Sequence, residues 1–155
     1  MSSEKFRFIR EVAIRYVGQR RRAPRSMTKP AQIEAYLRRR VRDDAREHLV
    51  AIYLDARLRP IGDAIVSIGT ASSTAAHPRE VFQTAIALGA CALVVAHSHP
   101  SGDPSPSDAD LKVTRRLASA GRLLGIELLD HLVWARDGAF RSIAQMCPEA
   151  FRSEA

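Results

Sequence analysis

Two histidines, His97 and His99, stand two positions apart, after an apolar run and directly before Pro100. Residues at this spacing on a β-strand point to the same side, with Cα atoms about 6.6 Å apart. Their imidazole nitrogens can then bind one metal ion, at about 2.0–2.1 Å each for zinc. Pro100 ends the strand, so the pair is expected at the strand's end, where ligand sites of sheet proteins gather. Histidine pairs near loops are common, so a metal site needs a third ligand.

Asp110 is the candidate for that third ligand. The run Ser105–Asp108 is typical of a helix start, with Ser105 as the cap and Pro106 in the first turn. Ser107 and Asp110 then share one face of that turn. In the alternative register these two residues themselves form the capping box, although Pro106 favours the first register. Two histidines and a carboxylate are a ligand set of open catalytic zinc sites, which keep a fourth position for water.

Amide hydrolysis at such a site also needs a carboxylate base and a donor for the developing oxyanion. Two glutamates precede the histidines. Glu80 lies in the first turn of a predicted helix, where the helix dipole already explains a negative charge. Glu47 has no capping role and lies between the predicted helix over 30–45 and the predicted strand over 49–54, at the end of a central strand, so we prefer Glu47 as the base. Ser107 is the candidate oxyanion donor.

The other histidines and the cysteines are interpreted as structural. His48 is expected at the surface, and His77 is expected to cap a helix. His131 is interpreted as a core histidine, with a place behind a metal ligand as the alternative. Cys91 and Cys147 are interpreted as packing residues.

The elements that must position these residues follow the order β-α-β-β-α-β-α-β-β. Apolar alternation and short apolar runs predict strands over 12–17, 49–54, 61–68, 92–96, 126–135 and 139–143. Helical spacing predicts helices over 30–45, 78–89 and 106–124. This order predicts an α/β (α+β layered) fold, in which a mixed β-sheet is flanked by helices. We expect an N-terminal strand and basic arm over 1–29 and one domain over 30–150.

Composition and charge restrict the function classes further. The chain has 155 residues, 46% of them hydrophobic, which is enough for one domain with a core. No apolar stretch approaches the roughly 18–20 residues of a membrane span, and the first residues lack the apolar core of a secretory signal, so we expect a cytoplasmic protein. Of the 24 Lys and Arg residues, 16 lie in the first sixty positions, in part as two clusters, Arg20–Arg25 and Arg38–Arg46. These clusters predict either contact with nucleic acid or a solvated basic surface.

The segment from His97 to Asp110 fits the pattern H-x-H-P-x(6)-S-x(2)-D, which resembles the JAMM metallopeptidase motif of MPN (JAB) domains. The segments His77–Glu80 and Asp130–Leu132 resemble the RadC group of that superfamily. The likeness covers residues from about 30 to 145. Two features depart from the group: Ser98 stands where relatives usually have Asn, and the segment before residue 30 is too short for their helix-hairpin-helix region. We expect Ser98 to face away from the metal.

The resemblance implies zinc ligands at His97, His99 and Asp110, the motif serine at Ser107 and the catalytic glutamate at Glu47. It implies a mixed sheet flanked by helices, related to the fold of cytidine deaminases. It also implies zinc-dependent cleavage of peptide or isopeptide bonds in a peptide or protein substrate. The alternatives are a DNA-associated accessory protein, in line with the DNA repair label of RadC-like proteins, and a metal-dependent nuclease.

Overall fold

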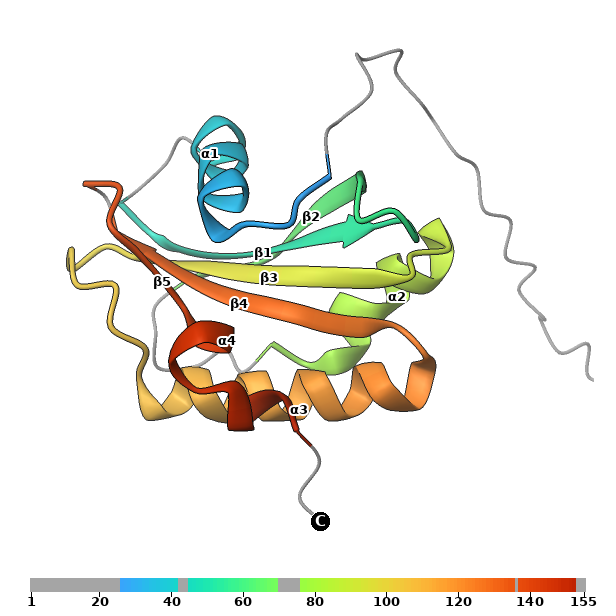
Figure 1. The fold of residues 1–155 in the computed structure, drawn as a ribbon. Helices are drawn as coiled ribbons and strands as arrows, with labels where there is room; N and C mark the ends of the chain where they lie inside the picture. The colour runs from blue at the N-terminus through green and yellow to red at the C-terminus, as the bar shows by residue number, and fades with distance from the viewer. Residues whose placement is uncertain (1–25, 42–44, 70–75, 136, 153–155) are drawn as a thin grey trace, which may run out of the picture.

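The computed structural model describes residues 26–41, 45–69, 76–135 and 137–152, which form a mixed five-stranded sheet with helices on both faces (Figure 1). The strands are β1 (Glu47–Leu54), β2 (Pro60–Gly69), β3 (Ala92–His99), β4 (Glu127–Ala135) and β5 (Phe140–Ser142). The helices are α1 (Pro30–Arg40), α2 (Pro78–Leu88), α3 (Asp108–Leu124) and α4 (Ile143–Met146), followed by a 3-10 turn, η1 (Pro148–Phe151). The predicted α+β layered fold is confirmed. The strand predicted over 12–17 lies outside the described residues.

The sheet order is β2-β1-β3-β4-β5. β1 pairs antiparallel with both β2 and β3, β3 pairs parallel with β4, and β5 returns antiparallel along β4. The parallel pair β3 and β4 is joined through α3, as parallel neighbours require a crossover connection. The start of β1 therefore lies beside the end of β3, and the start of α3 follows that end after a short loop.

Successive side chains of β1 and β3 point to opposite faces of the sheet and so belong to two separate hydrophobic cores. One set of buried side chains packs against α2 and α3, on the lower side of the sheet in Figure 1 (Leu49, Ala51, Tyr53, Leu93 and Val95). The intervening set packs against α1, on the upper side (Val50, Ile52, Leu54, Ala92, Val94 and Ala96). Because the period of a strand is two, the parity of a residue in β1 or β3 decides which helices it faces.

Local signals explain the helix ends. α1 begins at Pro30, which suits a first turn, and ends at Arg40, earlier than the predicted 45. His77 caps α2 by accepting from the backbone N–H of Arg79, which confirms its predicted role. α3 begins after Ser107, which accepts from the backbone N–H of Asp110.

The predicted start of α3 with Ser105 as the cap is therefore wrong, and the alternative capping box is the observed one. Ser107 and Asp110 bond reciprocally through side chain and backbone, which satisfies two donors of the first turn. Pro106 precedes the cap instead of occupying the first turn.

The second half of α3 packs closely against the chain that follows it. A side chain at Gly121 would collide with the carbonyl oxygen of Ile126 and would crowd the Phe82 ring of α2. Glycine is therefore required for α3 to lie this close to the start of β4. Within the described residues, no helix is both long and apolar enough to cross a lipid bilayer.

Candidate metal centre

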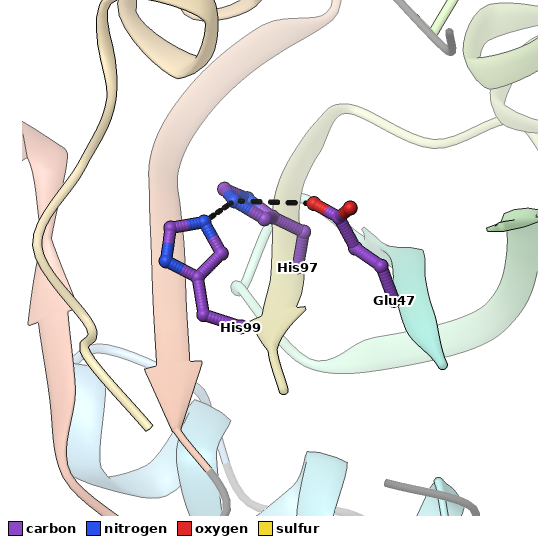
Figure 2. Close-up of side chains that lie close together, drawn as sticks. All are labelled: Glu47, His97 and His99. Atoms are coloured by element: carbon purple, nitrogen blue, oxygen red, sulfur yellow. Dashed lines mark hydrogen bonds and ion pairs between the residues drawn. The ribbon is translucent and has the colours of Figure 1, made fainter. Parts of the chain in front are cut away.

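The candidate centre forms where the first residue of β1 meets the last residues of β3. Glu47 opens β1, and Leu49, two residues further along on the same face, pairs with His97 in the antiparallel register. His97 Nε2 lies 2.8 Å from His99 Nε2 and 4.0 Å from Glu47 Oε1. Figure 2 shows the carboxylate of Glu47 and the ring of His99 approaching His97 from different sides. The ligand atoms of these three side chains all lie within 4.8 Å of one another, so the cluster could hold a metal ion.

Asp110 joins the cluster from the first turn of α3. Its Oδ1 lies 3.1 Å from His97 Nε2, and its Oδ2 lies 3.6 Å from His99 Nε2. The structure thus brings together the three residues expected to bind the metal and the glutamate expected to act as base. Their roles stay predictions, and their convergence is a finding.

The spacing of these atoms fits a divalent metal. Two ligand atoms of one tetrahedral zinc ion, each at about 2.0–2.1 Å, lie about 3.3 Å from each other. His97 Nε2 lies 2.8 Å from His99 Nε2 and 3.1 Å from Asp110 Oδ1, near this value, and His99 Nε2 lies 3.6 Å from the other oxygen of the carboxylate, Oδ2. Glu47 Oε1, at 4.0 Å from His97, stands further out. The set of two imidazoles and one carboxylate suits zinc and several other divalent metals.

The capping box of α3 holds the carboxylate of Asp110. Its Oδ2 accepts from the Ser107 hydroxyl at 2.7 Å and from the Ser107 backbone N–H at 2.6 Å. Burial raises the pKa of Asp110, but the hydrogen bond and charge of His97 and the bonds from Ser107 outweigh it and leave the pKa well below its usual value. Asp110 is therefore ionised at neutral pH, as a metal ligand must be. The predicted oxyanion role of Ser107 stays a prediction.

Two further residues lie behind the ligands. His131 of β4 is 1% exposed, and its Nε2 lies 2.8 Å from His97 Nδ1. Thr114 of α3 is also buried, and its Oγ1 lies 2.7 Å from His131 Nδ1. Burial lowers the pKa of His131 well below its usual value, and nearby His97 lowers it further, so the ring is neutral. His131 therefore takes the alternative place behind a ligand, and its polar atoms are satisfied there.

Sequence reasoning missed Thr114 entirely. The available signal was its position four residues after Asp110, on the same face of α3. His99 has its own supporting contact, because its Nδ1 lies 2.8 Å from the carbonyl oxygen of Asp103 in the loop before α3.

The opposite face of the sheet contains a different polar pair. Ser98 points away from the cluster, as expected, and its Oγ accepts from the backbone N–H of His48 at 2.9 Å. The predicted surface position of His48 is wrong: His48 is buried, with Nδ1 at 2.8 Å from the carbonyl oxygen of Arg46. Cys91 is exposed, which contradicts its predicted packing role, whereas Cys147 packs partly buried beside Ile143.

Arginines of the second basic cluster already have acidic partners. Arg38 forms an ion pair with Glu34 at 2.6 Å, and Arg40 forms one with Asp63 of β2. The first cluster, Arg20–Arg25, lies outside the described residues.

The mixed sheet and the histidine-carboxylate cluster define a JAB-type domain. A family model described as "RadC-like JAB domain" matches residues 27–147, so the chain belongs to this family. Among curated proteins, the chain is similar to a "UPF0758 protein" of Geotalea uraniireducens, at 39% identity over 132 residues, covering 85% of this chain and 58% of that protein.

Further relatives agree with this assignment. A "UPF0758 protein" of Methanosarcina acetivorans is 38% identical over 77% of this chain and 52% of its own length. One of Geobacillus thermodenitrificans is 51% identical over 57% of this chain and 39% of its own length. The chain thus spans about half the length of the curated relatives it matches.

Proposed function

We propose that this chain is a metal-dependent hydrolase that cleaves peptide or isopeptide bonds, with zinc as its metal. The observation that carries the proposal is the arrangement around His97 Nε2. Asp110 lies within 3.1 Å of this atom, whereas Glu47 lies at 4.0 Å. A ligand set with a further carboxylate beside it is what metal-assisted hydrolysis requires. Membership of the RadC-like JAB family supports the same reaction class.

His97, His99 and Asp110 would hold the zinc ion, which when bound would polarise the scissile carbonyl and lower the pKa of a water molecule toward about 7. Glu47 would accept a proton from the attacking water. It would return that proton to the nitrogen of the leaving amine as the carbon–nitrogen bond breaks. Glu47 is the first residue of β1 and lies partly exposed beside buried His97, a position from which its carboxylate would reach both water and substrate.

Ser107 would contribute first by orienting Asp110. Its hydroxyl proton is directed at Asp110 Oδ2, at 2.7 Å. Donation to a developing oxyanion would require this hydroxyl to turn from Asp110 to the substrate, so its two contributions would alternate.

The test separates metal binding from turnover. The purified chain is analysed for bound zinc and assayed with a library of quenched-fluorescence peptides and with peptides linked through a lysine side chain. Glu47→Gln is expected to retain zinc and to lose turnover by about 10²- to 10⁴-fold, as expected for loss of a general base. Glu80→Gln, which changes a glutamate in the first turn of α2, is the matched control and is expected to retain turnover.

Full turnover in Glu47→Gln would remove Glu47 from the mechanism. Cleavage of DNA instead of any peptide, lost in the same variant, would overturn the peptidase proposal in favour of a nuclease.

A DNA-associated role as a binding module is the alternative proposal. For this role we assign the DNA contact to Arg20, Arg21, Arg22 and Arg25. In the second cluster, Arg38 and Arg40 already form ion pairs. Replacing these four by Ala should then abolish a steeply salt-dependent affinity for duplex DNA, whereas Glu47→Gln should leave that affinity unchanged.

A further inference from the structure

A continuous row of hydrogen bonds runs from the helix α3 to the first predicted ligand. It begins at the backbone carbonyl of Asp110, passes through Thr114 Oγ1 and the two nitrogens of His131, and ends at His97 Nδ1. Each step measures 2.7–2.8 Å. The row is buried and lies on the face of the sheet toward α3.

The direction of every proton in this row follows from its first member. A carbonyl can only accept, so two oxygens 2.7 Å apart require Thr114 to donate to Asp110 O. The single hydroxyl proton is then used, and Thr114 Oγ1 must accept from His131 Nδ1–H. A neutral imidazole has one N–H and one lone pair, so His131 Nε2 accepts from His97 Nδ1–H. In the neutral ring that metal binding requires, the Nε2 of His97 then has the lone pair, directed toward Asp110 and His99.

His99 reaches the same state by a shorter route. Its Nδ1 donates to the carbonyl oxygen of Asp103 at 2.8 Å, so in the neutral ring its Nε2 has the lone pair. The two Nε2 atoms lie 2.8 Å apart, where one proton can be shared between them, and a metal ion that takes both lone pairs would replace that proton. Both rings are thus oriented with Nε2 toward a shared position. Buried side chains hold the ring of His97, and a loop carbonyl holds the ring of His99.

We propose that His131 and Thr114 are positioning residues, which fix the proton of His97 on Nδ1 and so present its Nε2 to the metal. This inference rests on the proposed zinc site and extends it to residues that touch neither metal nor substrate. Partners of this kind behind a metal-binding histidine typically change metal affinity by about 10- to 100-fold when removed.

Two substitutions of similar polarity separate positioning from packing. Gln can place an oxygen where His131 Nε2 lies and so still accept from His97. Asn is shorter, reaches only the position of Nδ1, and leaves His97 without its acceptor. We expect His131→Asn to weaken zinc binding by about 10- to 100-fold and His131→Gln to stay within about threefold of the unchanged chain.

Thr114 offers a second matched pair. Thr114→Val keeps the shape but removes the hydroxyl, so the proton of His131 is no longer fixed on Nδ1. Thr114→Ser keeps the hydroxyl. Zinc affinity should fall several-fold, up to about tenfold, in the Val variant and recover in the Ser variant.

The experiment measures the affinity of the full chain for Zn²⁺ by competition with a chromophoric chelator, together with the urea unfolding of each metal-free variant. Ser98→Ala is the control, because it removes a buried hydrogen bond from the same strand on the opposite face. It should lower stability without changing zinc affinity.

Three results are decisive. Equal zinc affinities in His131→Asn and His131→Gln, or losses that follow only the lost stability, would overturn the positioning role alone. Failure of the unchanged chain to bind zinc would overturn both the zinc site and its positioning residues. Zinc binding with the expected order of variants, but no hydrolysis, would support the positioning role and overturn only the proposed enzyme activity.

Discussion

At the junction of β1 and β3, the face toward α3 presents Glu47 and His97, and the face toward α1 presents His48 and Ser98. Both faces thus contain a histidine and a second polar residue, at the same level of the sheet. On the α1 face, backbone groups satisfy these side chains: Arg46 O lies beside His48 Nδ1, and His48 N–H donates to Ser98.

On the α3 face, no backbone group of the described residues bonds to the ring of His97, whose nitrogens contact His131 and His99. The first turn of α3 brings a carboxylate, Asp110, and β4 brings another imidazole, His131. The polar atoms there remain directed at one another around a shared position. A histidine in a strand is therefore a candidate ligand only where the neighbouring helix and strand bring further ligands or hydrogen-bond partners to its ring. The residue type alone does not show whether it binds a metal.

The largest expected effect is the difference in zinc affinity between a substitution on the α3 face of β3 and one on its α1 face. His97→Ala removes a predicted ligand and is expected to weaken zinc binding by about 100- to 1,000-fold, because one ligand of several supplies part of the free energy of metal binding. Ser98→Ala, one residue along the strand, should leave zinc affinity unchanged. Equilibrium dialysis followed by metal analysis checks both. Equal zinc retention by the two variants would contradict the site.

The next effect concerns the close approach of α3. Gly121→Ala adds a methyl group against the fixed carbonyl of Ile126 and is expected to destabilise the fold by about 1–3 kcal/mol. Gly62→Ala is the control, because the methyl group there would meet only the flexible end of Leu88. Urea unfolding measures both free energies. A smaller loss for Gly121→Ala than for Gly62→Ala would show that α3 is not held by this contact.

The two possible starts of α3 can be separated by a smaller effect. Ser107→Ala removes the observed cap and should cost about 1 kcal/mol of stability, within the usual range for capping residues. Ser105→Ala should be close to neutral. Thermal unfolding of the metal-free chain gives both values, and the reverse order would restore the rejected register.

The smallest expected effect is on the pH dependence of stability, and it concerns a carboxylate whose pKa is shifted in the opposite direction to that of Asp110. The pKa of Asp110 is lowered, whereas burial raises the pKa of Asp130 above 3.8 despite bonds from Ser142 and the backbone N–H of Ala144. Folded Asp130 therefore keeps its proton to a higher pH than the unfolded chain does, so the free energy of unfolding falls as the pH rises through that window. Asp130→Asn should remove this decline. Urea unfolding from about pH 4 to about pH 6 measures it, and identical slopes would contradict the assignment.

The sequence alone predicted the sheet and the helices well, because alternation in the strands and helical spacing were both clear. It also predicted that His97 and His99 share a side, since strand parity fixes this. The start of α3 was missed because S-x-x-D occurs twice in the chain, at Ser105 and at Ser107, and Pro106 fits a position beside either.

Other features required tertiary information. His48 is buried on the face of the sheet that carries Val50 and Ile52, and no pattern within β1 states that this face is covered at its first residues. The contact of His131 with His97 depends on the parallel pairing of β3 and β4, and Thr114 meets His131 only after α3 docks. Such contacts join residues 17 and 34 positions apart, so local periodicity could not predict them.

The βαβ unit formed by β3, α3 and β4 has one more consequence. All three predicted ligands and both supporting side chains belong to this single unit, whereas Glu47 comes from a separate strand. Under the proposed function, metal binding and proton transfer would thus come from different parts of the chain. A change confined to the start of β1 could silence the chemistry and leave an intact metal holder, so a relative lacking the glutamate would be a binder of the ion instead of an enzyme.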